Sequence, residues 1–236
     1  MPRSWALTDV GAVRKHNEDN MLARPDLGLW VVADGAGGHA SGEVASGMIV
    51  NALSLLPTHL SAGELLSSIR LGVSKVHTAL REEATRRGGN VMIASTFVGL
   101  MIRDRHFACL WAGDSRAYLL RHGHLEQITH DHSLVQELVD AGSLLPEEAE
   151  HHPHANVITR AVGADDDSLE LDKVIGQVQP GDRFLLCSDG LSKTLSEQEI
   201  QGLLSAPDGT PPTELLIHAA LAHHVNDNVT AVVVEV

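Results

Sequence analysis

Short turns between apolar runs in the middle of the chain limit the possible folds more than any other feature of the sequence. Three consecutive strands are predicted at Ala94–Ile102, His106–Trp111 and Ala117–Arg121. The junctions at 103–105 and 121–124 consist of charged residues, histidine and glycine, which is typical of hairpin turns. Strands joined by hairpins pair in the antiparallel sense, so we expect antiparallel sheets.

The remaining elements follow an order that suits the same architecture. Further strands are predicted at Trp5–Asp9, Asn20–Ala23, Leu29–Asp34, Arg183–Ser188 and Val229–Val236. Helices are predicted over 44–55 and 65–80, and at Ser133–Ala141, Ser196–Leu204 and Thr213–Val225. This order does not suit a doubly wound parallel sheet. It suits antiparallel sheets with helices packed outside, and the strand order stays open.

The size and charge of the chain limit the class of protein to which it can belong. A chain of 236 residues without a Pro/Gly/Ser-rich linker favours a single domain, 1–236, which needs no disulfide or metal merely to fold. The formal net charge of −14 argues against binding nucleic acid or an anionic membrane, because either needs a basic face. No apolar run has the length of a membrane span, and the first residues lack a signal-peptide core. We therefore expect a cytoplasmic monomer without membrane insertion.

Aspartates stand at the ends of the predicted strands. Three follow an apolar run and precede Gly or Ser, and a fourth stands just ahead of the last strand: Asp34, Asp114, Asp189 and Asp227. One Asp-Gly pair is ordinary turn chemistry. Several such acids, together with the pair Glu18 and Asp19, would repel one another in a core unless a cation neutralised them. Oxygen ligands select hard ions, so the pattern predicts a carboxylate-bridged Mg²⁺ or Mn²⁺ centre.

Arg14 stands just upstream of the acidic pair. A guanidinium beside a metal cluster suits a phosphate clamp, because its forked donors match phosphate oxygens. The alternative is a salt bridge from Arg14 to Glu18 or Asp19.

Two other signals are weaker. The glycine-rich segment after Asp34 lacks the Gly-Lys-Ser/Thr of a nucleotide-binding loop. The histidine groups at 151–154 and 218–224 are interpreted as surface residues rather than zinc ligands.

Six motifs, in order along the chain, carry a family resemblance. They are Arg14-Lys-His-Asn-Glu18-Asp19, Val32-Ala-Asp34-Gly35-Ala-Gly-Gly-His39, Ala94-Ser95-Thr96, Trp111-Ala-Gly-Asp114-Ser115-Arg116-Ala117, Ser188-Asp189-Gly190-Leu191 and Asn226-Asp227-Asn228-Val229-Thr230. The pattern resembles the metal-dependent serine/threonine protein phosphatases, the type 2C or PPM family, in its compact bacterial branch. The resemblance covers the chain from Ala6 to Val236.

The resemblance implies an α+β fold, a four-layer α-β-β-α sandwich with two central antiparallel sheets flanked by helices. In such enzymes the residue matching Asp34 bridges two Mn²⁺ or Mg²⁺ ions, and the carbonyl matching Gly35 contacts the second ion. Asp189 and Asp227 match the carboxylates that complete the first site.

The outer parts of the centre follow in the same way. Glu18 and Asp19 match residues that hold metal-bound waters. Asp114 matches the ligand of a third, weaker metal site, which also draws on the residue matching Asp189. The polar segment over about 133–160 corresponds to the family's flap, near the substrate entrance.

The same resemblance implies hydrolysis of phosphoserine and phosphothreonine in proteins. A water bridging two divalent ions has a lowered pKa and supplies a hydroxide that attacks phosphorus in line, without a phosphoenzyme. Arg14 would stabilise charge on the non-bridging oxygens, and His39 is the candidate proton donor to the leaving alkoxide. The sequence departs from the family pattern at Ala36, where relatives have His or Met. A second departure is Lys193, where relatives commonly have an acidic or amide residue.

Other functions could use the same centre. One is a phosphoprotein-binding pseudo-phosphatase or regulator, although the complete set of carboxylates argues against it. Another is a phosphatase for a small metabolite or for an anti-sigma-antagonist protein. By family analogy, a protein phosphatase of this kind is expected to oppose a cognate Ser/Thr kinase.

Overall fold

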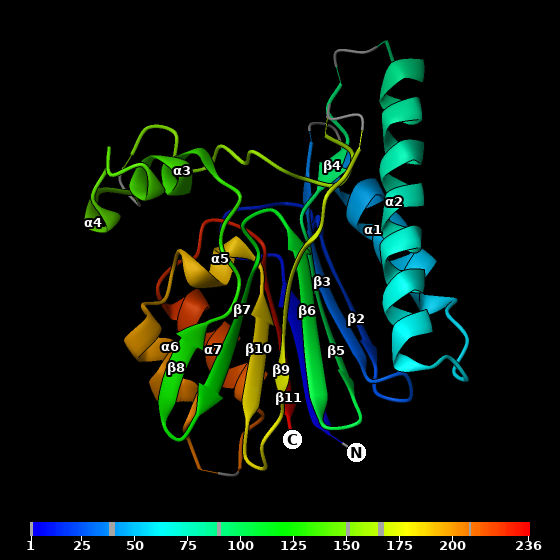
Figure 1. Cartoon of the computed structure of the whole chain (residues 1–236). Helices are drawn as coiled ribbons and strands as arrows, with labels where there is room; N and C mark the ends of the chain where they lie inside the picture. The colour runs from blue at the N-terminus through cyan, green and yellow to red at the C-terminus, as the bar shows by residue number, and fades with distance from the viewer. Residues whose placement is uncertain (1, 38–40, 89–90, 150–151, 165–167, 208) are drawn as a thin grey trace.

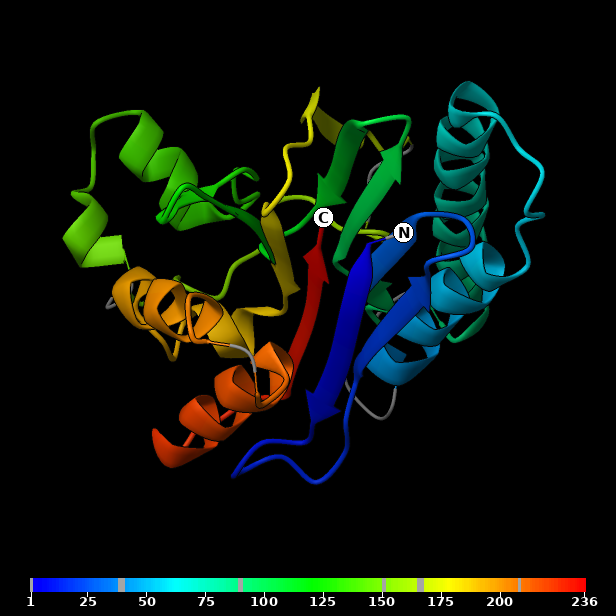
Figure 2. The same ribbon diagram turned by 90° about the horizontal axis from the view of Figure 1, so that it is seen from below.

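Two β-sheets packed face to face form the centre of the molecule, and helices cover both outer faces (Figure 1, Figure 2). The computed structural model describes residues 2–37, 41–88, 91–149, 152–164, 168–207 and 209–236. The arrangement confirms the predicted sandwich of antiparallel sheets with helices outside.

The first sheet has five antiparallel strands in the order β1-β11-β10-β7-β8. Their bounds are Arg3–Asp9 (β1), Val229–Glu235 (β11), Arg183–Cys187 (β10), Arg116–Arg121 (β7) and His124–Gln127 (β8). The last strand of the chain therefore lies between β1 and β10. Because Arg3 pairs with Glu235, the two ends of the chain lie side by side (Figure 2).

The second sheet has the order β2-β3-β5-β6-β9, and the short strand β4 also pairs with β3. The bounds are Asp19–Arg24 (β2), Leu29–Ala36 (β3), Ala94–Ser95 (β4), Phe97–Arg103 (β5), His106–Ala112 (β6) and Asp172–Gln177 (β9). β5 and β6 form the hairpin that the sequence predicts at 103–105.

The helices form three groups. The six-stranded sheet is covered by α1 (Ser41–Ser54) and α2 (Ala62–Arg86), and the five-stranded sheet by α5 (Asp189–Ser192), α6 (Glu197–Leu204) and α7 (Pro212–Ala222). Two short helices, α3 (Leu134–Asp140) and α4 (Pro146–Ala149), project from one end of the sandwich (Figure 1). They lie within the predicted flap. Ser133 is the N-cap of α3, and its side chain accepts a hydrogen bond from Gln136 N.

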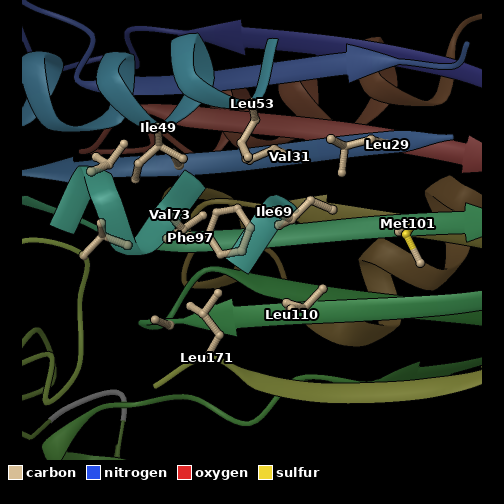
Figure 3. Close-up of a cluster of buried hydrophobic side chains, with 14 of the residues drawn as sticks. Leu29, Val31, Ile49, Leu53, Ile69, Val73, Phe97, Met101, Leu110 and Leu171 are labelled. Atoms are coloured by element: carbon tan, nitrogen blue, oxygen red, sulfur yellow. The ribbon is translucent and has the colours of Figure 1, made fainter. Parts of the chain in front are cut away.

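The central strands are largely apolar, as expected for strands that are buried on both faces. In β3, Leu29, Val31 and Ala33 pack with α1 and α2, where Phe97 and Ile49 also lie (Figure 3). The alternate residues Trp30 and Val32 point into the layer between the two sheets. Full burial of a large apolar side chain contributes about 1.5–3 kcal/mol, so both layers stabilise the sandwich.

One predicted strand proves to be interrupted. Ala94–Ile102 is not continuous, because Thr96 separates β4 from β5. Its Oγ1 accepts a hydrogen bond from Asp34 N at 3.0 Å, and its own N–H donates to Asp34 O at 2.8 Å. The interruption thus fixes the backbone of a predicted metal ligand.

Two edge strands were not predicted. β8 has only four residues, and β9 alternates between half-buried and exposed positions and includes Ile175, which is 65% exposed. Each has a neighbour on one side only, so neither has the uniformly apolar character of a central strand. Within the described residues, no helix combines the length and apolar character needed to cross a bilayer.

Candidate metal centre

The pairing of β2 with β3 brings the first two carboxylates together. Asp19 and Asp34 are direct partners in the antiparallel register of these strands. The preceding residue, Glu18, accepts hydrogen bonds at its carbonyl from Gly35 N at 3.1 Å and from Ser46 Oγ at 2.6 Å. Local strand pairing therefore places Glu18 and Asp19 beside Asp34 and Gly35 at the end of β3.

Asp19 connects the two sheets. Its Oδ2 accepts hydrogen bonds from Ser188 Oγ and from Thr230 Oγ1, both at 2.7 Å. Its Oδ1 is buried and has no partner among the described residues. Burial raises the pKa of Asp19 to about 6 against the opposing effect of the two hydroxyl donors, and the charges of Asp189 and Asp227 add to the increase.

Asp34 lies at the centre of the acidic group. Burial raises its pKa well above the usual range of an aspartate, and the charges of Asp19, Asp189 and Asp114 raise it further. Negative charge at Asp34 is therefore unfavourable unless a cation is close.

Asp189 lies in the site because two turns pack closely against each other. It is the first residue of α5, directly after β10, and Ser188 is the N-cap of that helix. A Cβ at Gly190 would lie only 2.0 Å from the carbonyl oxygen of Asn228. Glycine at this position thus lets the turn that carries Asp189 pack against the turn that carries Asp227.

Asp227 is held by hydrogen bonds on either side of it. Its Oδ2 accepts a hydrogen bond from Arg14 at 2.7 Å. The neighbouring Asn228 accepts from Glu18 N at 2.8 Å and donates from Nδ2 to the carbonyls of Val10 and His16, both at 2.9 Å. Asn228 therefore fixes the loop that bears Arg14 against the last strand. Arg14 pairs with Asp227 in this structure, rather than with Glu18 or Asp19.

Asp114 follows β6 and is 3% exposed. Burial raises its pKa to about 6, and the charge of Asp189 adds to this, while Lys193 opposes it. Lys193 Nζ lies 3.2 Å from Asp114 Oδ2 and 2.6 Å from Asp189 Oδ2. Burial lowers the pKa of Lys193, but the two carboxylates more than offset this effect and keep the ammonium charged.

A cleft of about 800 Å³ opens beside these acids. Arg14, Asp114, Asp189, Asp227 and Lys193 line its inner part. Its other wall comes from the predicted flap and includes Ser133, Gln136, His152 and Asn156. The cleft therefore lies between the predicted flap and α5.

The donor set fits hard divalent cations. Among the described residues, no three His, Cys, Asp or Glu side chains already surround one point at metal-binding geometry, since Lys193 and Arg14 engage three of the acids. The buried oxygens Asp19 Oδ1 and Asp114 Oδ1 nevertheless lack partners. Mg²⁺ or Mn²⁺ stabilises carboxylates that are crowded together and have oxygens without hydrogen-bond partners.

The structure gathers most of the predicted site residues in one place. Arg14, Asp114, Asp189 and Asp227 line the same cleft, and Asp19, Asp34, Gly35 and Glu18 lie at the strand ends beside them. His39, the predicted proton donor, lies outside the described residues.

Sequence reasoning included the residues that support the acids only as members of motifs and gave them no role. Ser188, Thr230 and Asn228 each bind a partner from a distant part of the chain. The available signal was the presence of Ser and Thr hydroxyls and an Asn amide within otherwise apolar strand ends.

Comparison with known proteins agrees with this geometry. A family model described as Protein phosphatase 2C matches residues 13–225. The chain belongs to the protein phosphatase 2C family. Among curated members, the serine/threonine protein phosphatase PstP of Mycobacterium tuberculosis is 38% identical over 234 residues, which are 99% of this chain. The chain spans only 45% of that relative's length.

Solved structures of the protein phosphatase 2C family have the same fold. PppA, described as a key regulatory component of T6SS in Pseudomonas aeruginosa, superposes with a TM-score of 0.91 at 46% identity, covering 99% of this chain and 97% of PppA. The catalytic domain of PstP in complex with two manganese ions superposes with a TM-score of 0.88 at 36% identity, covering 99% of this chain and 97% of that domain.

Proposed function

We propose that this chain is a metal-dependent phosphatase that hydrolyses phosphoserine and phosphothreonine in proteins. The observation that carries the proposal is the convergence of carboxylates from the ends of strands in both sheets on one cleft that also contains Arg14. The likeness to PstP, which binds two manganese ions in its solved complex, supports the same metal use here.

The roles of the acids follow from their positions. Asp34, the Gly35 carbonyl, Asp189 and Asp227 would hold the Mn²⁺ or Mg²⁺ ions. Glu18 and Asp19 would hold metal-bound water. When bound, such ions lower the pKa of a coordinated water and neutralise charge on the phosphate.

The other polar groups of the cleft serve the substrate. The Arg14 side chain is 54% exposed and uses one terminal nitrogen on Asp227, so further N–H donors remain for phosphoryl oxygens. His39 is retained as the proposed proton donor to the leaving alkoxide. The flap, over about 133–160, would contact the peptide around the phosphorylated residue.

The proposal extends to the setting of the enzyme. We propose a single-domain monomer, 1–236, acting in the cytoplasm on phosphoproteins and opposed by a cognate Ser/Thr kinase. Nucleic acid is not a proposed partner, because the net charge of −14 disfavours it.

The test is phosphate release from a phosphothreonine peptide with Mn²⁺, with EDTA, and in the variant Asp34→Asn. Wild type should be active only with metal, and Asp34→Asn should lose at least 100-fold in kcat, roughly the effect of removing a key electrostatic group. The matched control is Asp26→Asn, which changes an aspartate paired with Arg24 on the surface. Undiminished turnover in EDTA would contradict the proposal.

The same variant separates catalysis from phosphoprotein binding. If Asp34→Asn lost turnover in vitro but fully replaced wild type in the cell, the chain would act as a binding regulator. A panel of phosphopeptides and small phosphate esters, compared by kcat/KM, would separate a protein phosphatase from a metabolite phosphatase.

A further inference from the structure

Lys193 lies where three oxygen donors from separate parts of the chain meet. Its Nζ is 2.6 Å from Asp189 Oδ2, 3.2 Å from Asp114 Oδ2 and 3.0 Å from Asn156 Oδ1. Asp189 begins α5, Asp114 follows β6, and Asn156 belongs to the flap. Two carboxylates and an amide oxygen around one point are the ligand set of a hard metal cation.

The ammonium is held in this place by the helix that carries it. Lys193 follows Asp189 by four residues and is the C-cap of α5, so the two side chains share one face of the turn. The carboxylate of Asp114 is 4% exposed, whereas the Lys193 side chain is 35% exposed. The Lys193 side chain therefore reaches Asp114 from the cleft and places its positive charge beside a buried carboxylate.

We propose that the Lys193 ammonium replaces a third metal ion at Asp114, so that the chain takes up two divalent ions and not three. The inference rests on the proposed function and changes one expectation from the sequence, the role of Asp114 as the ligand of a third metal ion. A divalent ion at this point would lie against a tethered positive charge. Coulomb repulsion at such distances disfavours its entry.

The hydrogen bond to Asn156 gives Lys193 a second role. Because Asn156 lies in the flap and Asp189 in α5, Lys193 joins the two walls of the cleft. Lys193 is therefore a positioning residue, which acts through the carboxylates and the flap.

The test counts Mn²⁺ ions bound per chain, by equilibrium dialysis with metal analysis and by calorimetry. Wild type should bind two ions, and Asp114→Asn should also bind two. Lys193→Met keeps the length of the side chain but removes its charge, and should bind a third, weaker ion. The double variant Lys193→Met/Asp114→Asn should return to two.

Several results would overturn the inference. These are a third ion in wild type that disappears in Asp114→Asn, or a Lys193→Met protein that folds with wild-type circular dichroism yet gains no ion. Should Lys193→Met fail to fold, the comparison of wild type with Asp114→Asn still decides. Failure of the proposed function looks different, since a wild-type protein that binds no Mn²⁺ would remove both proposals together.

Discussion

The hydroxyl of Ser188 lies 2.7 Å from the carboxylate of Asp19, although one residue follows β10 in the five-stranded sheet and the other begins β2 in the six-stranded sheet. Thr230 of β11 makes the same contact from the next strand, also at 2.7 Å. The orientation of the Asp19 carboxylate thus depends on how the sheets pack, because hydroxyls of one sheet donate hydrogen bonds to a carboxylate of the other.

Ser188→Ala should therefore destabilise the fold. The variant removes a donor to Asp19 and the acceptor of Thr230 N, both buried, and should lower the free energy of unfolding by about 1–3 kcal/mol. Urea denaturation measures the change. Ser192→Ala is the matched control, because Ser192 Oγ is buried without a hydrogen-bond partner among the described residues, and its removal should cost little. Equal losses in the two variants would contradict the prediction.

Two glycine substitutions should act in opposite directions. Gly190→Ala places a methyl group 2.0 Å from the Asn228 carbonyl, and should destabilise the protein by about 1–3 kcal/mol. Gly202→Ala lies in α6 with no atom within 4 Å of the new Cβ, and should stabilise it by about 0.5–1 kcal/mol. Thermal denaturation of both variants checks the signs. A stabilising Gly190→Ala would show that the two turns are not closely packed.

Arg14→Ala should impair turnover more than folding. Charge-assisted hydrogen bonds to phosphate contribute about 1.5–3 kcal/mol, so kcat/KM should fall roughly 10- to 100-fold. The Tm should change little, because the ion pair with Asp227 is largely exposed. Arg14→Lys should recover part of the loss, and Arg3→Ala, which removes the partner of Glu235 at the start of β1, should have no kinetic effect. If the kinetic constants of Arg14→Ala were unchanged, Arg14 would serve only in the salt bridge with Asp227.

Asp182 should make the fold sensitive to acid. Burial alone would raise its pKa, but hydrogen bonds from Arg121 at 2.8 and 2.7 Å and from Gln179 N at 2.7 Å outweigh burial and lower it. A lowered pKa in the folded state gives stability that is present above the unfolded pKa of about 3.9 and lost as pH falls through the folded value.

Asp182→Asn should accordingly cost about 1.5–3 kcal/mol at pH 7, and the difference from wild type should shrink below about pH 4. Urea denaturation at a series of pH values measures it. Glu82→Gln, at an exposed position on α2, is the control whose stability should match wild type at every pH. A difference from wild type that stayed constant down to pH 3 would contradict the linkage.

Removing metal should lower stability as well as activity. An ion present at 100 times its dissociation constant stabilises the folded state by about 2.7 kcal/mol, which corresponds to roughly 5–10 °C in Tm for a chain of this size. Mn²⁺ should therefore raise the Tm of wild type and of Asp26→Asn. It should raise the Tm of Asp34→Asn much less. A similar rise in all three proteins would place the bound metal elsewhere.

The sequence was most informative where a short motif is enough to determine the local backbone conformation. Asp34, Asp114 and Asp189 were recognised because each follows an apolar run at a tight turn, and the structure places them within electrostatic reach of one another. The hairpin at 103–105 is an equally local feature. Local chemistry decides these elements, so a single sequence suffices to predict them.

Long-range partners were beyond the same reasoning. Thr230 and Asp19 are 211 residues apart, and Asn228 and Glu18 are 210 apart. No periodicity in the sequence relates such positions, because the pairing of β11 with β1 and β10 and the packing of the two sheets together bring them into contact. Edge strands such as β9 were missed for another reason, since one-sided pairing leaves a weak hydrophobic signal.

The position of β11 has a consequence for the timing of assembly in the cell. On the ribosome, β1 and β10 cannot join one sheet until β11, which pairs with both, has been synthesised. A nascent chain that stops before β11 therefore lacks the predicted ligand Asp227 and the Thr230 hydroxyl that holds Asp19.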